Sequence, residues 1–516
     1  MDIYAKQALE EYSNDATATR RGGQGKPFWN IDSTQFMYAP AFQFPRIQGS
    51  VKYVFTATDE KDKKYSFTAD DSIAALTPIW KDIPTGVVCL QVEAIHKSGQ
   101  RYLCGARTFF KSAPFPGRED LPPKATSYRE SALNGLKFVL NDHITRNWLT
   151  GLPKHDYYHS VYSSKMTQAT VRALVALAQR EPEYAEEAMK MATNAADYLI
   201  SITYGEDSPV AGLPPTYSFL NLDRQVVRSS APVAEEREFT VMMIYPADVG
   251  RMYLQLEEQT QDEKYFKMAE KIAVYYLKHV QPNGSWHLLV SAKTGEPETK
   301  NYCISFGILD FIHQFYERTG DECWKELEEN YFAFIEKNCL ATYNWEGQFE
   351  DSKISDNYSN LSHYEADGMI RYIAKYYPDD KEKMAVAEEL MRFVEDQFVV
   401  WGRFSPLNKD YNEQRDTWYS PAGLEQYHWH VPIDASTASI AKSFLCLYEV
   451  TKKRLYLEKA FALADTMTRM QDKETGKIPT HWMKEDGVNF VENFWMNCHV
   501  NATFLLDELA KYENEE

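Results

Sequence analysis

Short apolar segments separated by polar stretches occupy the first part of the chain. Between residues 50 and 108 these segments are β-branched or aromatic, and in one of them Val51, Tyr53 and Phe55 occupy alternate positions. A period of two residues is typical of strands that are buried on one face. We therefore predict a small antiparallel β-sandwich domain over residues 1–115.

A different period begins at residue 125. Residues 116–124 contain three prolines and a glycine, which predicts a linker. Beyond them the apolar residues follow the 3.6-residue period of helices, and a helical hairpin repeats about every 60 residues. The pattern predicts stacked helical hairpins over residues 125–516.

The hairpins contain two kinds of helix. Helices rich in Ala, Ser, Gly and Met can crowd around an axis, and we predict these inner helices over 160–179, 240–259, 303–318, 360–377, 434–450 and 495–512. Helices with one charged face belong outside, and we predict them over 127–142, 185–202, 263–279, 322–338, 381–398 and 454–470. Six of each predict a mainly α fold, an (α/α)6 toroid, with an open solenoid as the alternative.

The connections between helices alternate in length. Inner helices lead to outer helices through short turns, whereas each outer helix leads to the next inner helix through a long connection. The long connections should therefore meet at one rim, where the inner helices begin. Because long loops in compact domains are usually functional, we expect the active site in a funnel at this rim.

The fourth long connection carries a cluster of acids. Glu346, Glu350 and Asp351 follow Trp345 within seven residues. Glycoside hydrolysis needs one protonated and one ionised carboxyl group, and an aromatic neighbour raises a carboxyl pKa by excluding water. Asp351 and Glu350 are therefore candidate catalytic residues and Trp345 a candidate substrate-binding residue. A loop of solvated acids is the alternative.

The fifth long connection ends in a dense polar cluster. Glu425 joins the candidate catalytic acids, and Tyr427, His428 and His430 are candidates for binding sugar hydroxyls. The His-x-His spacing is a weak metal signal, and we predict no metal. Asp434 is interpreted as a helix N-cap or an acid of the first helical turn.

Other long connections supply further candidate substrate-binding residues. Arg237 can pair with a substrate carboxylate through two hydrogen bonds. The alternative for Arg237 is an ion pair within its own loop, which contains Glu235, Glu236 and Glu238. Substrate contacts are also predicted for His159, Tyr217, His481 and Trp482.

Composition narrows the classes of partner. The net charge is −19, so the basic surface that nucleic acid requires is not expected. The seven cysteines are odd in number and form no CxxC pair, which suits free thiols in a reducing compartment. No apolar run reaches the length of about 18 residues that a membrane span needs. We expect a cytoplasmic protein without a membrane partner, or a periplasmic one if a signal peptide has been removed, and we leave homo-oligomerisation open.

Three segments, WEGQFED, FVEDQFVVW and GLEQYHWHVPID, carry a family resemblance. With the predicted Ig-like sandwich ahead of an (α/α)6 toroid, the chain resembles the six-hairpin glycosidases, and most of all the exo-β-glucuronidases of glycoside hydrolase family 154. The resemblance implies release of a terminal β-linked glucuronic acid from an oligosaccharide, without a cofactor. It assigns no catalytic residue.

Two other functions stay open on the sequence. A β-elimination polysaccharide lyase would use a Tyr or His base, and Tyr427, His428 and Asn360 could serve. A non-catalytic glycan-binding protein would bind sugar without turnover. The hydrolase hypothesis, with its carboxyl pair drawn from Asp351, Glu350 and Glu425, is the one we carry forward.

Overall fold

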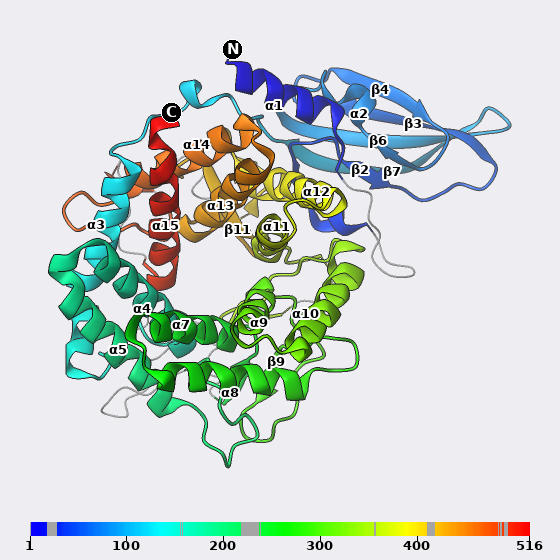
Figure 1. Cartoon of the computed structure of the whole chain (residues 1–516). Coiled ribbons are helices and arrows are strands. Elements are labelled where there is room, and N and C mark those ends of the chain that lie inside the picture. Colours follow the sequence, from blue (N-terminus) through cyan, green and yellow to red (C-terminus); the bar gives the residue numbers. More distant parts are fainter. Residues whose placement is uncertain are drawn as a thin grey trace.

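The computed structural model describes most of the chain: residues 2–17, 28–154, 156, 158–217, 237, 239–354, 358–409, 418–482, 484–485, 488–489 and 494–515. Helices dominate the part after residue 125, and strands dominate the part between residues 35 and 111. The helices form a ring, and the strands lie against one side of that ring (Figure 1).

Six inner helices surround the axis of the ring: α4 (Ser163–Arg180), α7 (Tyr245–Thr260), α9 (Phe306–Thr319), α11 (Tyr364–Tyr376), α13 (Asp434–Thr451) and α15 (Met496–Leu509). Each contacts the next in chain order, and α15 contacts α4. The ring is therefore closed, which confirms the predicted (α/α)6 toroid and excludes the open solenoid.

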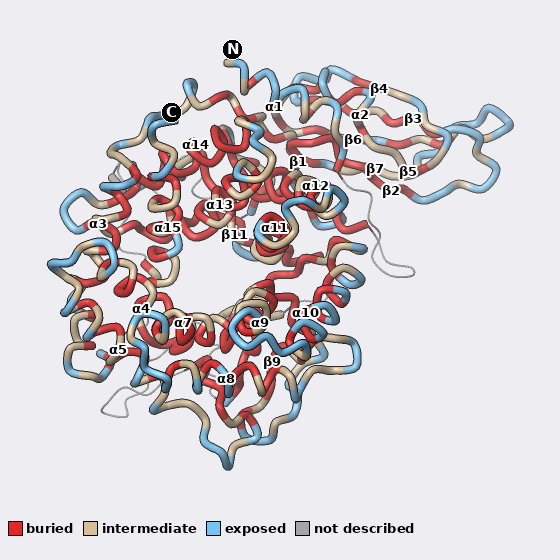
Figure 2. Tube along the Cα trace, viewed as in Figure 1, coloured by how far each residue is buried: buried red, intermediate tan, exposed pale blue. Residues whose placement is uncertain are grey.

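Six outer helices cover this inner layer: α3 (Tyr128–Asn141), α5 (Ala185–Ile202), α8 (Glu263–His279), α10 (Glu322–Ile335), α12 (Lys381–Phe398) and α14 (Arg454–Met470). Buried residues line the interface between the two layers, and exposed residues lie on the outside of the ring (Figure 2). The outer helices agree with the predicted ranges to within a few residues.

Repeated capping residues set the short turns between inner and outer helices. Asp262, Asp321 and Asp380 each precede an outer helix, and each side chain accepts a hydrogen bond from a backbone N–H of the first turn. Gln261 and Gly320, just before two of these caps, adopt the left-handed conformation that ends an inner helix. In these two hairpins the outer helix therefore begins after only two residues, because the two caps are adjacent.

The long connections contain short strands that the sequence did not predict. They are β8 (Thr240–Met242), β9 (Leu289–Ser291), β10 (Val399–Val400), β11 (Ala422–Gln426), β12 (Trp429–Pro432), β13 (Lys484–Glu485) and β14 (Val488–Asn489). One of them corrects a predicted helix: residues 240–242 form β8, and α7 begins only at Tyr245, with Pro246 in its first turn. Proline is common in the first turn of a helix, because a backbone N–H at that position would have no hydrogen-bond partner within the helix and its absence costs nothing.

The strands of the strand-rich region are β1 (Gln35–Phe36), β2 (Ala41–Gln43), β3 (Ser50–Thr58), β4 (Lys64–Ala69), β5 (Ile73–Ala75), β6 (Gly86–His96) and β7 (Arg101–Lys111). Five of them form a sheet in the order β1-β7-β6-β3-β4, and β2 pairs with β5. Its apolar core contains Phe36, Phe55, Trp80 and Phe109. Helix α1 (Ile3–Asn14), which was not predicted, precedes these strands, and α2 (Thr77–Trp80) lies between them. The Ig-like assignment stays a prediction.

Two buried acids at the end of α12 connect the strand-rich region to the ring. Glu395 accepts hydrogen bonds from Tyr12 and Tyr38 and pairs with Lys459 of α14 at 2.8 Å. Asp396 accepts from the backbone N–H groups of Met37 and Tyr38. The FVEDQFVVW segment is therefore a junction between the two parts of the chain.

No helix in the described ranges is both long enough and apolar enough to cross a membrane.

Candidate active site

A cavity of about 260 Å³ lies where the inner helices begin. Lys165 of α4, Tyr245 of α7 and Tyr364 of α11 line it, together with Trp345 and Glu425 from the long connections. The cavity is therefore in the predicted funnel, and it combines aromatic rings with carboxyl groups.

Glu425 reaches the cavity from the hairpin of β11 and β12. The strand register shifts between Leu424 and Gln426, so Glu425 lies at a bulge. Bulges re-aim a side chain relative to a regular strand. Burial, followed by the negative charge of Asp351, raises the pKa of Glu425 to about 8. Glu425 is consequently protonated at neutral pH and can donate a proton.

Asp351 and Glu350 lie close enough to Glu425 for their charges to raise its pKa, so the three predicted acids are brought together. Of the three, Glu425 alone is in the cavity lining among the described residues. Lys165 Nζ pairs with Glu350 Oε1 at 2.5 Å, and the Tyr245 hydroxyl donates to the other carboxylate oxygen of Glu350. Burial, followed by the charge of Glu350, raises the pKa of Asp351 to about 6. Asp351 is therefore ionised at neutral pH, and Glu350 is already held by two partners.

Two predicted substrate-binding residues hold the acidic loop. The Tyr217 hydroxyl donates to the backbone carbonyl of Glu350 at 2.9 Å. Arg237 donates to the carbonyls of Glu350 at 3.2 Å and of Ser352 at 3.3 Å. Neither side chain belongs to the cavity lining among the described residues. These contacts give both residues a positioning role. Glu235, Glu236 and Glu238 lie outside the described residues.

Trp345 occupies the position that the sequence suggested. Its ring is buried at 1% exposure and lines the cavity with Glu346 and Phe349. Apolar rings beside the carboxyl groups displace water, which is consistent with the raised pKa of the nearby acids.

The structure places three of the predicted binding residues in packing roles. Tyr427 contacts Ser33 and Gln397 through its hydroxyl, at the junction with the strand-rich region. Burial lowers the pKa of His430 to about 4, and its Nε2 lies 3.1 Å from the Gln397 carbonyl. Trp482 is fully buried. None of these side chains lines the cavity within the described chain.

His159, His428 and His481 also lie away from this cavity. His159 lies between Asp142 and Asp156, at 3.1 and 2.7 Å. Burial alone would lower the pKa of His159, but the two carboxylates raise it. His428 is exposed, and His481 Nε2 accepts from Trp429 Nε1 at 3.1 Å. Sugar contacts by these residues stay predictions.

Sequence reasoning missed the residues that the inner helices contribute. Lys165, Tyr245, Tyr364 and Glu365 all lie in the first turns of inner helices and line the cavity. Burial raises the pKa of Glu365 to about 7, and its Oε2 accepts from the Phe306 N–H at 2.9 Å. The available signal was their position at the N-terminal ends of inner helices, next to the rim.

Comparison with known proteins shows a similarity of fold and no similarity of sequence family. No family model matches the chain, and no curated protein matches its sequence. The solved structure of cellobiose 2-epimerase from Spirochaeta thermophila is similar, with a TM-score of 0.51 and 11% identity over 75% of this chain and 99% of that chain. The likeness is one of fold.

Two further solved structures overlap with the chain. A family 76 glycoside hydrolase from a bovine Bacteroides thetaiotaomicron strain has a TM-score of 0.48 and 11% identity, over 94% of this chain and 100% of that chain. An unsaturated glucuronyl hydrolase from Streptococcus agalactiae has a TM-score of 0.47 and 11% identity, over 75% and 94%. Membership of glycoside hydrolase family 154 stays a prediction.

Proposed function

We propose that the chain is a glycoside hydrolase in which Glu425 is the general acid and Asp351 the partner carboxylate. The observation that carries this proposal is a pair of interacting carboxyl groups with pKa values of about 8 and about 6, of which Glu425 is in the cavity lining. Enzymes assign acid and base roles by separating two such pKa values around the working pH. Glu425 would protonate the leaving oxygen, and Asp351 would activate water or attack the sugar.

The proposed substrate is a terminal β-linked glucuronic acid of an oligosaccharide. Lys165 and Arg251 in the cavity lining are paired with carboxylates, whereas Arg172 has no carboxylate partner among the described residues. Arg172 can therefore pair with the carboxylate of an anionic sugar, which favours such a sugar over a neutral one. The family resemblance supports the same sugar.

The lyase alternative loses two of the three residues that supported it, Tyr427 and Asn360. Tyr427 is bound at the junction, and Asn360 donates to Gln426 at 2.7 Å and accepts from the His428 N–H at 2.9 Å. Of the tyrosines that do line the cavity, Tyr245 and Tyr364 have pKa values raised well above 10 by burial. A tyrosine whose pKa is raised in this way stays protonated at neutral pH, so it is not available to take a proton from the substrate.

A panel of 4-nitrophenyl glycosides tests the function. We expect cleavage of the β-D-glucuronide at a kcat/KM at least about tenfold above that of the β-D-glucoside, because a charge-assisted contact contributes about 1.5–3 kcal/mol. Glu425→Gln should lower the kcat/KM of this cleavage by at least about 100-fold. Sugar binding without release of nitrophenolate from any glycoside would instead support the glycan-binding hypothesis. An ultraviolet-absorbing unsaturated product from a uronic acid polymer would support the lyase.

Cellobiose belongs in the same panel because the fold is shared with a cellobiose 2-epimerase. Product analysis by chromatography distinguishes epimerisation, which conserves the disaccharide, from hydrolysis, which releases two monosaccharides. Conversion of cellobiose to an isomer, with no glycoside cleaved, would refute the hydrolase proposal.

A further inference from the structure

A second and larger cavity, of about 500 Å³, lies along the ring beyond the active-site cavity. Its lining residues come from later turns of the inner helices, such as Gln255 of α7, Lys442 of α13 and Glu508 of α15. Because the inner helices run away from the rim, this cavity is on the side opposite the long connections. It adjoins the active-site cavity, since Arg172 and Asn501 line both.

Four of the inner helices each contribute one cation to this second cavity: Arg172, Arg251, Arg371 and Lys442. Helices α4 and α11, which carry Arg172 and Arg371, are three positions apart in the ring of six and thus lie across the axis from each other. Positively charged side chains therefore line the cavity on opposite walls.

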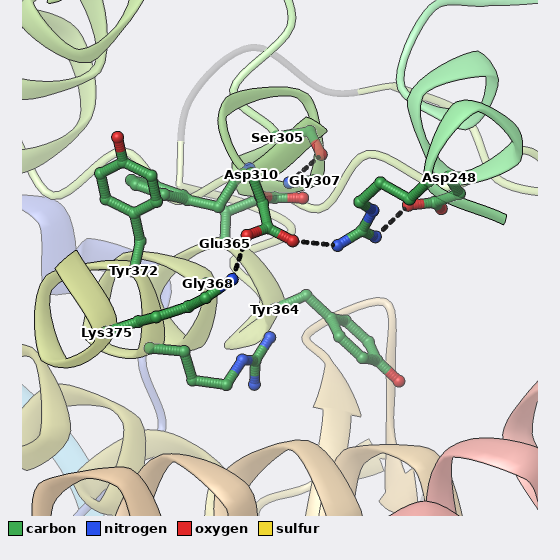
Figure 3. A pocket seen from close by; sticks show the side chains of 12 residues that line it. Asp248, Ser305, Gly307, Asp310, Tyr364, Glu365, Gly368, Tyr372 and Lys375 are labelled. Carbon is green, nitrogen blue, oxygen red and sulfur yellow. Dashed lines mark hydrogen bonds and ion pairs between the residues drawn. The ribbon is translucent and has the colours of Figure 1, made fainter. Parts of the chain in front are cut away.

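Two of these four cations are neutralised by the protein. Arg251 pairs with Asp248 at 2.5 Å and with Asp310 at 2.8 Å, and Lys375 also reaches Asp310 at 3.0 Å. Figure 3 shows Asp248, Asp310 and Lys375 joined in this network. Lys442 pairs with Glu508, and both side chains are about one third exposed, at 31% and 32%. The mouth of the cavity is therefore open to solvent.

The other two cations have polar or aromatic neighbours instead. The Arg172 guanidinium lies 5.2 Å from the centre of the Phe504 ring. Arg371 donates to the carbonyl and hydroxyl of Ser439 and to the hydroxyl of Ser443. Within the described ranges no carboxylate oxygen bonds either guanidinium. Burial and the charge of Arg251 lower the pKa of Arg172 to about 10, so it stays charged at neutral pH.

We propose that this second cavity binds a phosphate or sulfate group, either as the free ion or carried by a small sugar. A guanidinium offers a planar fork of donors that matches such an oxyanion. A tetrahedral oxyanion can accept from Arg172 and Arg371 on opposite walls, whereas a planar carboxylate presents only two oxygens in one direction. The inference does not depend on the proposed hydrolase activity, because Arg371 and Lys442 lie outside the active-site lining.

Calorimetric titration of the whole chain with inorganic phosphate and with sulfate, at constant ionic strength in chloride, tests the proposal. We expect saturable binding by the parent protein and a Kd at least about tenfold higher for Arg371→Gln, because a charge-assisted pair is lost. Arg403→Gln is the matched control, since Arg403 is an exposed arginine paired with Glu60, and it should bind like the parent. Circular dichroism and the melting temperature in chloride show whether Arg371→Gln is folded.

Two further arms locate the ion and identify its source. Glu425→Gln should bind phosphate as the parent does, which separates this site from the catalytic proposal. Tighter binding of glucose 6-phosphate than of phosphate would identify a sugar ester as the ligand, and equal binding would identify the free ion. The proposal is overturned if the parent shows no saturable binding, if folded Arg371→Gln binds equally well, or if Lys165→Met alone abolishes binding.

Discussion

The pH dependence of cleavage follows from the two interacting carboxyl groups, Glu425 and Asp351. The active form needs Glu425 protonated, with a pKa of about 8, and Asp351 ionised, with a pKa of about 6. Near neutral pH each group is about 90% in its required state, so about 80% of the enzyme is active. At about pH 5 only about 10% of Asp351 is ionised, and at about pH 9 only about 10% of Glu425 is protonated. We expect a bell-shaped profile centred near neutral pH.

Glu425→Gln separates the two limbs of this profile. The amide keeps the shape of the side chain and removes the proton, so kcat/KM should fall by at least about 100-fold. The alkaline limb should disappear, because Glu425 was its cause. The acid limb should remain near pH 6, because burial and Glu350, rather than Glu425, raise the pKa of Asp351. Initial rates on 4-nitrophenyl β-D-glucuronide, stopped in alkali, measure both effects.

Glu365→Gln is the matched control for this experiment. Glu365 lines the same cavity and has a raised pKa of about 7, so it is the rival donor. If Glu425 is the acid, Glu365→Gln should retain the alkaline limb. Loss of that limb in Glu365→Gln, together with its retention in Glu425→Gln, would refute the assignment.

Three other substitutions test the supporting structure. Lys165→Met removes the charge that lowers the pKa of both Glu425 and Asp351, so both limbs should move to higher pH, by about 1–2 units. Arg237→Ala should lower kcat about tenfold with a smaller change in KM, since Arg237 orients the acidic loop; a change confined to KM would favour direct substrate contact. Asp380→Ala removes the cap of α12 and should lower the free energy of unfolding by about 1 kcal/mol in a urea titration; an unchanged midpoint would contradict that role.

The ring was predictable because its signal is local and repeated. Each hairpin carries its own helical period, and three of the outer helices begin with the same turn chemistry, the Asp caps at residues 262, 321 and 380. Helix α1 was missed because few of its residues are buried: Ala5, Ala8 and Tyr12. Its helical state depends on docking against α14, which no local pattern records.

The site was predictable only in part, because the sequence does not show in which direction each side chain points. The acids at 350, 351 and 425 were found because they precede inner helices. The bulge at Glu425 re-aims its side chain, so Glu425 lines the cavity while Gln426 accepts a hydrogen bond from Asn360. A sequence shows that polar residues are crowded together, but the hairpin of β11 and β12 decides which of them share a cavity.

The junction at Glu395 and Asp396 has a consequence for how the chain unfolds. Both carboxyl groups are buried in the ring, yet several of their hydrogen-bond donors belong to the segment before residue 40. Removing one partner of a buried charge costs several kcal/mol, so neither part keeps its stability when the other melts. We expect the two to denature in a single cooperative transition, with a proteolytic cut between them destabilising both halves.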